Sequence, residues 1–252
     1  MIFVYTCVSE HAWRLVDSGP LPTAESAAAD EAILGAHAEG VVPDTLHFYT
    51  RSEPTISIGY FQRVSEAVDL DECARRGVRL VRRRSGGSTI FTDSGQMIYA
   101  VVMPASAIGS GEASFGAVCG PIARALGRFG ADARHRPVND IEIGGRKVSG
   151  SAQLRSRGSV LQHGTVLIDT DIEAMDAVLK GGSVRPSERI TDLAAVLDDP
   201  PSMDEVKAAV TDEIARSFGI SFEKGSLTEI ERHRIAELVS SRYGSDDWNR
   251  RI

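Results

Sequence analysis

Residues 139–153 read NDIEIGGRKVSGSAQ, and this stretch predicts how the middle of the chain folds. Its centre, Gly144-Gly145, is a two-residue turn signal, because glycine accepts the positive φ angles that tight hairpin turns require. The residues on either side can therefore pair as antiparallel strands. A second turn is predicted at Arg157-Gly158, followed by a third strand from Val160 to Asp169. The stretch thus predicts an antiparallel meander.

Further strands and helices are expected on both sides of this meander. Leu46, Phe48 and Thr50 alternate with polar residues, and after a break at Glu53-Pro54 the strand pattern resumes. The nearly continuous apolar run from Gln96 to Met103 predicts a buried strand. The remaining predictions are strands over residues 55–58 and 78–82, and helices over residues 23–40 with Thr23 as N-cap, 69–77, 114–129 with a kink or restart at Pro121, and 171–180 closed by Gly181-Gly182.

Residues 186–252 have a different pattern. Ser202 with Glu205, and Thr228 with Glu231, have the spacing of a capping box, in which two side chains satisfy N–H groups of a first helical turn. They predict two helices around a short strand at residues 220–222. We predict an α+β fold with a mixed or antiparallel central sheet flanked by helices. The first domain covers residues 1–185, and residues 186–252 form a small helix–strand–helix extension packed on the same domain.

The composition is that of a globular protein and limits the classes of partner. The chain has 252 residues, of which 42% are hydrophobic and 25% charged, and a formal net charge of -7. This negative charge argues against broad nucleic-acid binding, and no apolar stretch approaches the roughly 18 residues of a membrane span. The three cysteines are far apart and form no CxxC pair, which favours a reducing compartment. We therefore expect a cytoplasmic protein with no nucleic-acid or membrane partner.

A basic segment departs from this acidic average. Residues 82–93 read RRRSGGSTIFTD. Three guanidinium groups lie beside the backbone N–H groups and hydroxyls of residues 86–89, an arrangement that suits a carboxylate or a phosphate. No Gly-Lys-Ser/Thr follows, so the segment is not a Walker loop. The alternative is a surface turn with solvated arginines.

Lys147 is the second candidate. It follows the predicted hairpin turn and precedes the small residues 149–152, over which a ligand can pack closely. An ammonium group there can hold an acyl carbonyl oxygen together with the phosphate of an acyl-adenylate, and can stabilise the charge that develops when the carbonyl is attacked. The alternative is a solvated lysine on a strand. Together with the basic segment, Lys147 predicts a site that activates a carboxylic acid with a nucleotide.

Three further residues are candidates for the same site. Asn139 and Asp140 can orient Lys147 or help to bind Mg²⁺, or they can simply belong to the turn before a strand. His163 lies on a predicted strand. It can line the same pocket, or it can satisfy its hydrogen bonds within the core or at a sheet edge.

Several segments match a known family in order. The chain resembles the lipoate–protein ligase branch of the biotin/lipoate protein ligase superfamily over nearly its whole length. Residues 243–249, YGSDDWN, look like the end of the shorter, archaeal-type ligases. The other matching segments are residues 13–19 (WRLVDSG), 46–49 (LHFY), 58–62 (IGYFQ), 81–87 (VRRRSGG), 139–140 (ND), 145–153 (GRKVSGSAQ) and 163–164 (HG).

The resemblance implies a two-step, AMP-forming reaction. Lipoate and ATP, with Mg²⁺, give lipoyl-AMP and pyrophosphate, and the lipoyl group then passes to a lysine of a lipoyl-acceptor protein. Lys147 is implied as the catalytic residue that bridges the acyl carbonyl and the phosphate, and Asp140 as a ligand of Mg²⁺. The substrate- and nucleotide-binding residues that the resemblance implies are Arg83, Gly86, Gly87, Ser88, Thr89, Ile90, Phe91, Asp93, Asn139, Asp140, Gly150, Ser151, His163 and Gly164.

The sequence departs from the family pattern in two respects. The family's usual GGGAVxHD is GGSTIFTD at residues 86–93, so Ser88 and Thr92 bear on the nucleotide contacts and on the acyl preference. The chain also stops where longer ligases continue into a C-terminal accessory domain. The resemblance implies that short ligases need this domain as a separate protein, so we expect a small accessory subunit.

Three alternatives to the ligase stay open. An octanoyl- or lipoyl-transferase of the same fold moves the acyl group between carrier proteins through a cysteine thioester, and its cysteine lies shortly before the Gly-Arg-Lys segment. Residues 133–140 contain no cysteine, and Cys7, Cys73 and Cys119 lack a motif for nucleophilic catalysis. A biotin ligase is disfavoured because its Gly-Arg-Gly-Arg-type loop is missing. A non-catalytic lipoate- or nucleotide-binding protein is disfavoured by Lys147 without being excluded.

Overall fold

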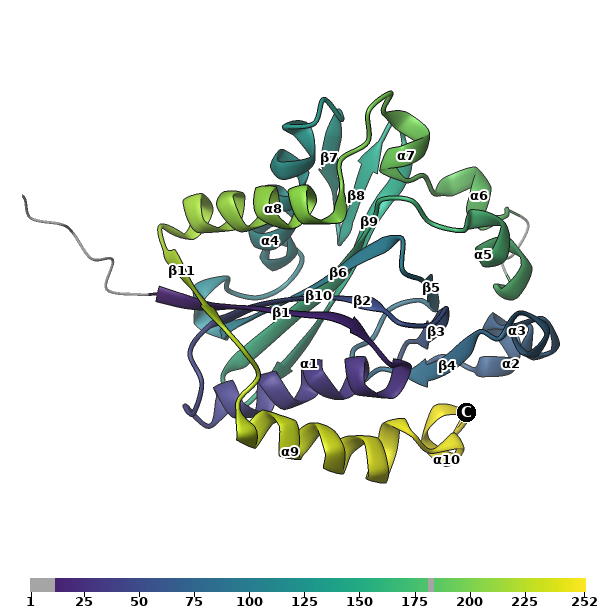
Figure 1. Ribbon diagram of the computed structural model, residues 1–252, viewed down its shortest axis with the longest axis horizontal. Coiled ribbons are helices and arrows are strands. Elements are labelled where there is room, and N and C mark those ends of the chain that lie inside the picture. The colour runs from purple at the N-terminus through teal and green to yellow at the C-terminus, as the bar shows by residue number, and fades with distance from the viewer. Residues whose placement is uncertain (1–11, 181–183) are drawn as a thin grey trace, which may run out of the picture.

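The computed structural model describes residues 12–180 and 184–252, and its central feature is an eight-stranded sheet (Figure 1). The strands follow the order β11-β1-β2-β6-β10-β9-β8-β7. β1 pairs in parallel with β2 and β11, and the other neighbours are antiparallel, so the predicted mixed sheet is confirmed. The strands are β1 Ala12–Leu21, β2 Thr45–Arg51, β6 Gln96–Pro104, β7 Ala133–Arg136, β8 Asp140–Ile143, β9 Arg146–Ser156, β10 Ser159–Leu167 and β11 Ser221–Gly225.

A second sheet of three strands carries the basic segment. Its order is β4-β3-β5, with β3 Thr55–Ile58, β4 Arg79–Arg82 and β5 Ile90–Thr92. Residues 83–89 connect its two outer strands. The helices are α1 Thr23–Ala38, α2 Val64–Ala67, α3 Leu70–Arg76, α4 Ala113–Gly127, α5 Ile172–Val178, α6 Pro186–Arg189, α7 Leu193–Val196, α8 Met203–Phe218, α9 Glu229–Leu238 and α10 Asp246–Asn249, with a 3₁₀ turn at Ala105–Ala107 and a π turn at Val239–Tyr243.

Helices cover both faces of the large sheet. α4 packs against α8 on one face, and α1 packs against α9 on the other (Figure 1). On the central strand β6, Val101 lies in the core beneath α4 and α8, whereas Ala100 and Val102 lie in the core beneath α1. Successive residues of a strand point to opposite faces. A strand buried on both faces therefore needs a continuous apolar run, which residues 96–103 provide.

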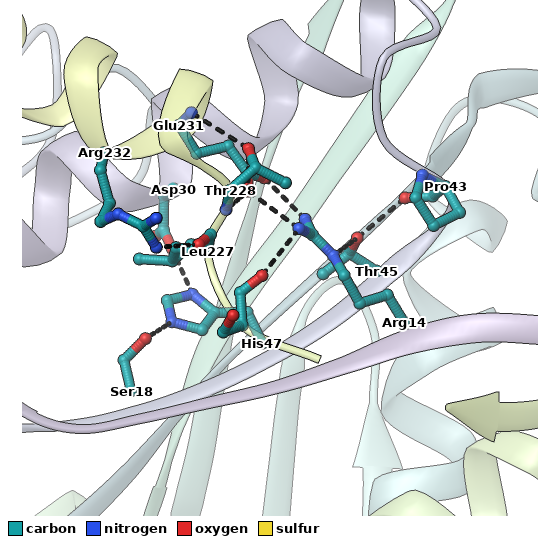
Figure 2. A network of polar contacts seen from close by, with 11 residues as sticks. Arg14, Ser18, Asp30, Pro43, Thr45, His47, Leu227, Thr228, Glu231 and Arg232 are labelled. Atoms are coloured by element: carbon teal, nitrogen blue, oxygen red, sulfur yellow. Dashed lines mark hydrogen bonds and ion pairs between the residues drawn. The ribbon is translucent and has the colours of Figure 1, made fainter. Parts of the chain in front are cut away.

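The C-terminal residues add to the edge of the large sheet through β11. Thr228 and Glu231 form the expected capping box at the start of α9. Glu231 also accepts two hydrogen bonds from the guanidinium of Arg14 on β1, at 2.6 and 2.8 Å, and this ion pair is buried (Figure 2). Ser202 and Glu205 form the second capping box, at the start of α8. Both expected helix starts are confirmed.

Some local expectations differ from the structure. Helix α1 begins at Thr23 itself, Pro22 occupies the N-cap, and the Thr23 hydroxyl donates to Glu53 instead. Helix α4 continues through Pro121 rather than restarting there. Gly181-Gly182 lie outside the described residues. Among the helices within residues 12–180 and 184–252, none is long and apolar enough to cross a membrane.

Candidate active site

A cavity of about 300 Å³ lies where helix α1, the small sheet and strands β9 and β10 meet. Its size is at the lower end of the roughly 300–1,000 Å³ typical of small-molecule sites. Its wall includes Ala27, Asp30, Glu31, Tyr49, Arg51, Ser57, Arg83, Arg84, Ser85, Gly87, Ser88, Ile90, Thr92, Ile98, Asn139, Asp140, Lys147, Gly150, Ser151, Ala152, Leu154, Leu161, His163, Gly164, Thr165 and Tyr243.

One wall of this cavity changes from polar to apolar along the strands. β9 and β10 are antiparallel, and of the four opposed pairs that line the cavity, three share one face of the sheet. Because alternate residues share a face, the pairs form one continuous surface whose ends are four residues apart, about 13 Å. The pairs are Gly150 with Thr165 at one end, Ala152 with His163 in the middle, and Leu154 with Leu161 at the other end.

Lys147 lies at the polar end of this wall. Its Nζ is 2.7 Å from Asp140 Oδ1, and the side chain is 32% exposed. A Cβ on Gly150 would lie under 3.0 Å from Lys147 Cε and Nζ, so the lysine crosses the strand directly over the glycine. A side chain at position 150 would occupy the same space. The absence of a side chain at Gly150 is therefore what leaves room for Lys147 in this position.

A β-bulge accounts for the side of the sheet that Lys147 faces. The pairing with β8 shifts between Ile141, which pairs with Ser149, and Glu142, which pairs with Lys147, so Val148 is an extra residue. Val148 belongs to the core on the α4 face of the sheet. In a regular strand, Lys147 would share that face with Ser149. The extra residue instead puts Lys147 on the cavity side with Gly150.

A serine, a histidine and an aspartate are joined in the middle of the cavity wall. His163 Nε2 is 2.7 Å from Ser85 Oγ, and His163 Nδ1 is 2.6 Å from Asp30 Oδ2. Burial raises the pKa of Asp30, but the hydrogen bonds and charges of His163 and His47 outweigh it and lower the pKa from 3.8 to about 2. Asp30 is therefore ionised near neutral pH. From this network we assign the proton on His163 to Nδ1, which leaves Nε2 to accept from the Ser85 hydroxyl.

Arg83 organises the loop that carries Ser85. The residue is buried, and its guanidinium donates to the carbonyls of Ser57, Gly86 and Ser88 at 2.7–2.8 Å, and to Ser85 Oγ at 3.0 Å. Burial lowers its pKa to about 10. Arg83 therefore keeps its charge at neutral pH and directs most of its donors at its own loop.

The arginines beside Arg83 are engaged as well. Arg82 is fully buried and donates to three carbonyls of residues 59–62. Arg84 forms an ion pair with Glu31 at 2.8 Å. Trp248 of α10 donates to the carbonyl of Arg82. The alternative of a surface turn with solvated arginines is therefore wrong for Arg82 and Arg83.

A second cavity, of about 590 Å³, lies on the other side of Lys147. The two cavities share Ser88, Ile90, Asp140, Lys147 and Thr165, so the Lys147–Asp140 pair lies at their junction. Besides Lys147, the basic side chains that line the second cavity are Arg136, Lys180 and Arg189.

The two cavities bring together most of the residues expected from the sequence. Thr89 and Phe91 line only the second cavity, and Gly86 and Asp93 line neither. The Asp93 carboxylate accepts N–H groups of Gly95 and Asp171, which is a structural role. Those that line the first cavity are Arg83, Gly87, Ser88, Ile90, Asn139, Asp140, Lys147, Gly150, Ser151, His163 and Gly164.

Among the described residues, no cysteine lines either cavity. Cys119 is buried, and its Sγ contacts Ser151 Oγ at 3.5 Å and Gln162 Nε2 at 3.4 Å. Burial raises the pKa of its thiol, and the same holds for Cys73. Cys7 lies outside the described residues. The expected structural role of Cys119 and Cys73 agrees with these surroundings.

A metal site is not formed by protein side chains alone in the described ranges. Residues 12–180 and 184–252 contain no cluster of three or more His, Cys, Asp and Glu side chains that could hold a metal ion. Asp140, expected as a Mg²⁺ ligand, has one carboxylate oxygen in contact with Lys147. A Mg²⁺ ion at Asp140 stays a prediction.

The sequence did not point to every residue at this site. Asp30 sits in an alanine-rich helix, and Ser85 stands out in the sequence only as part of the basic segment. Asp30 and His163 are 133 residues apart in the sequence, and Ser85 and His163 are 78 apart. They come together only in the folded protein, where His163 on β10 contacts both Asp30 on α1 and Ser85 in the loop of residues 83–89.

The geometry agrees with comparisons to known proteins. The model of the lipoyl protein ligase A/B catalytic domain matches residues 22–215. This chain belongs to that family. The match covers the whole basic segment and every residue that lines the two cavities except Tyr243, so the family-level expectation drawn from the sequence is confirmed.

Curated relatives of the family carry the name octanoyltransferase LipM. The protein from Symbiobacterium thermophilum is 37% identical over 95% of this chain and 98% of its own length. Those from Kyrpidia tusciae and Geobacillus kaustophilus are 35% and 32% identical, over 95% and 96% of this chain and 98% and 99% of their own lengths. These curated relatives are thus named as transferases, the alternative weighed above.

Solved structures similar to this chain are described as ligases. A lipoate-protein ligase A bound with ATP has a TM-score of 0.85 at 30% identity, over 95% of this chain and 98% of that one. A putative lipoate protein ligase from T. acidophilum with bound lipoic acid has a TM-score of 0.82 at 29% identity, over 96% and 99%. The expected fold is confirmed, and the chain is an enzyme of the lipoate ligase and transferase family.

Proposed function

We propose that this protein transfers an octanoyl-type acyl group from a carrier-protein thioester to a lysine of a lipoyl-acceptor protein, without ATP. The observation that carries the proposal is the similarity to octanoyltransferases over 95% of the chain. A thioester is already activated, so its acyl group can pass to an amine with release of the carrier thiol. The bonds balance, since one C–S bond breaks, one C–N bond forms, and the amine proton goes to the thiol.

The first cavity supports an acyl chain as the group that is moved. Its wall has an ammonium group at the Gly150 end and Leu154 with Leu161 at the other. An extended medium-length acyl chain can lie along this wall with its carbonyl towards Lys147. The Lys147 ammonium would then donate to the carbonyl oxygen as negative charge develops on it, an effect worth roughly 10²–10³ in rate where one such donor is removed. Asp140 keeps the ammonium in position.

A second candidate is ATP-dependent ligation of free lipoate or octanoate. The observation that favours it is the second cavity, which meets the first at Lys147 and carries Arg136, Lys180 and Arg189. Basic side chains suit the phosphates of ATP, and a ligase 30% identical to this chain has been described with ATP bound. In this candidate Asp140 would contact Mg²⁺, whose remaining ligands would be phosphate and water, and a small accessory subunit could take part.

One set of reactions separates the two candidates. The purified chain is given an acceptor domain and either octanoyl-carrier protein without ATP, or octanoate or lipoate with Mg-ATP, and modification of the acceptor lysine is followed by intact mass. We expect modification from octanoyl-carrier protein alone, reduced roughly 10²–10³-fold by Lys147→Ala. Lys224→Ala, at an exposed position on β11, is the matched control and should keep full activity. Modification that occurs only with Mg-ATP and pyrophosphate release would overturn the transferase proposal and support the ligase.

A further inference from the structure

Transfer between two carrier proteins is easier when the enzyme holds the acyl group in between. A covalent acyl-enzyme lets the donor leave before the acceptor arrives, and it splits one difficult step into two easier ones. Such an intermediate needs a nucleophile in the cavity wall. Neither Cys73 nor Cys119 lines either cavity. A different nucleophile among the described residues must therefore be considered.

Ser85 has the surroundings of an activated nucleophile. The 2.7 Å separation of Ser85 Oγ from His163 Nε2, and the 2.6 Å separation of His163 Nδ1 from Asp30 Oδ2, fall within the ~2.6–3.2 Å expected of a nucleophile–base–orienter relay. All three residues line the first cavity. The Asp30 carboxylate is itself held by the Tyr49 hydroxyl at 3.1 Å. Each member of the relay thus has a partner that fixes its orientation.

A charged donor beside Ser85 favours the deprotonated hydroxyl, which is the form that attacks a carbonyl carbon. Arg83 Nε donates to Ser85 Oγ at 3.0 Å, and Arg83 is itself buried. When His163 removes the hydroxyl proton, the guanidinium can stabilise the negative charge that grows on Oγ. The serine hydroxyl donates to His163 and accepts from Arg83, which is the arrangement that proton removal requires.

Ser85 and Lys147 both line the first cavity, and the strands beneath their contacts indicate their spacing. His163, which contacts Ser85, is two residues from Thr165, and Thr165 lies opposite Gly150 beneath the lysine. Two residues along a strand correspond to about 7 Å. A carbonyl carbon about 3–3.5 Å from the attacking oxygen, with its own oxygen about 3 Å from an ammonium, needs a span of this size. The nucleophile and the oxyanion donor can thus act on one acyl group.

We propose that Ser85 accepts the acyl group from the thioester donor and forms an acyl-serine ester, with His163 as general base and Asp30 as its positioning residue. The proposal rests on the transferase function proposed above. In the first step the C–S bond breaks, a C–O bond to Ser85 Oγ forms, and His163 passes the serine proton to the leaving thiolate. In the second step the acceptor lysine attacks the ester, a C–N bond replaces the C–O bond, and an amine proton returns through His163 to Ser85.

The chain contains its own control for this arrangement. Asp30 lies between two histidines, and the second, His47, has Nε2 2.9 Å from Ser18 Oγ and Nδ1 3.9 Å from Asp30 Oδ1 (Figure 2). Neither Ser18 nor His47 lines either cavity. Ser18 thus has a histidine partner and shares the same aspartate, but it has no access to the cavity. Ser18→Ala removes a comparable hydroxyl outside the proposed site.

The test follows the acyl group on the enzyme itself. The full chain is mixed with octanoyl-carrier protein without acceptor, thiol release is timed, and peptides are analysed by mass spectrometry after acid quenching. We expect a burst of about one thiol per protein and an octanoyl ester on the peptide that contains Ser85. Ser85→Ala should remove the burst and lower transfer at least about 10³-fold, His163→Ala should lower it roughly 10²–10⁴-fold, and Ser18→Ala should leave both unchanged.

Two further measurements distinguish loss of the nucleophile from loss of folding or of the transferase function. Octanoate binding, followed by calorimetry, should persist in Ser85→Ala, and Ser85→Cys should regain the burst as a thioester that neutral hydroxylamine cleaves. Two results would overturn the acyl-serine and leave the transferase function in place. One is equal transfer from octanoyl-carrier protein by wild type and by a folded Ser85→Ala variant. The other is an acyl label on a residue other than Ser85. The absence of any transfer from octanoyl-carrier protein by wild type would overturn both.

Discussion

Substitution of Gly150 by alanine should reduce acyl transfer without unfolding the protein. The added Cβ would lie under 3.0 Å from Lys147 Cε and Nζ, where ordinary contact is 3.4–4 Å. The nearest atoms belong to the flexible end of a side chain, so the lysine gives way and the strand keeps its course. The displaced ammonium then loses its 2.7 Å contact with Asp140 and its alignment with the acyl carbonyl.

The size of the effect follows from that displacement. A misplacement of about 1 Å at a reacting group can cost 10²-fold in rate. We therefore expect kcat/KM for acyl transfer to fall about 10²-fold, which is about 2.7 kcal/mol of transition-state stabilisation, while the free energy of unfolding changes by about 1 kcal/mol or less. The assay is acceptor modification by intact mass, together with urea unfolding of the same variant.

A double mutant and a matched glycine make this test specific. If Gly150 acts only by leaving room for the lysine, Gly150→Ala added to Lys147→Ala should cause no further loss of rate. A Cβ added at Gly127, at the end of α4, would meet no atom of another element within 4 Å, so Gly127→Ala should leave the rate unchanged. Full activity of Gly150→Ala, or losses that multiply in the double mutant, would refute the reasoning.

Three other predictions concern stability. Glu231→Ala leaves Arg14 buried without its bidentate partner and should lower the free energy of unfolding by roughly 3–5 kcal/mol in urea titrations; a loss below about 1 kcal/mol would show that the pair is dispensable. The pKa of Asp30 is lowered from 3.8 to about 2, and this shift contributes about 2 kcal/mol to the free energy of unfolding, present above about pH 4 and lost as the pH falls through 2. The difference in free energy of unfolding between wild type and Asp30→Asn should therefore narrow by that amount on acidification. A difference independent of pH would contradict this. Ser202→Ala removes the N-cap of α8 and should cost about 1 kcal/mol by thermal unfolding, against an unchanged value for the exposed Lys224→Ala.

The elements that the sequence predicted are those with short-range signals. The Gly144-Gly145 turn, the apolar run of β6 and the two capping boxes each depend on residues close together in the chain, and each is present in the structure. Most of the predicted site residues that line the cavities also came from two continuous segments, residues 83–91 and residues 139–151. The division of the chain at residue 186 stays a prediction.

The features that the sequence missed depend on contacts between distant residues. β11 joins the large sheet through β1, a partner more than two hundred positions away, and no local pattern encodes that pairing. The separation of β3, β4 and β5 into a second sheet was missed for the same reason. Asp30 became a candidate only when the fold brought α1 against His163 and Ser85. Local chemistry marks single residues, whereas a relay of three requires the tertiary structure.

Because of the bulge at Val148, the side of β9 that Lys147 faces does not follow from the number of residues between Lys147 and Gly150 alone. Lys147 and Gly150 are three positions apart, a spacing that a regular strand would divide between two faces. A regular strand with the same residues would turn the ammonium into the apolar layer under α4, where burial of an unpaired charge is costly. Deletion of Val148 would remove the extra residue, so it should leave Lys147 on the cavity face and cost only the buried Val148 side chain. When distant relatives are aligned, a one-residue gap in this interval is therefore compatible with a lysine that still faces the cavity.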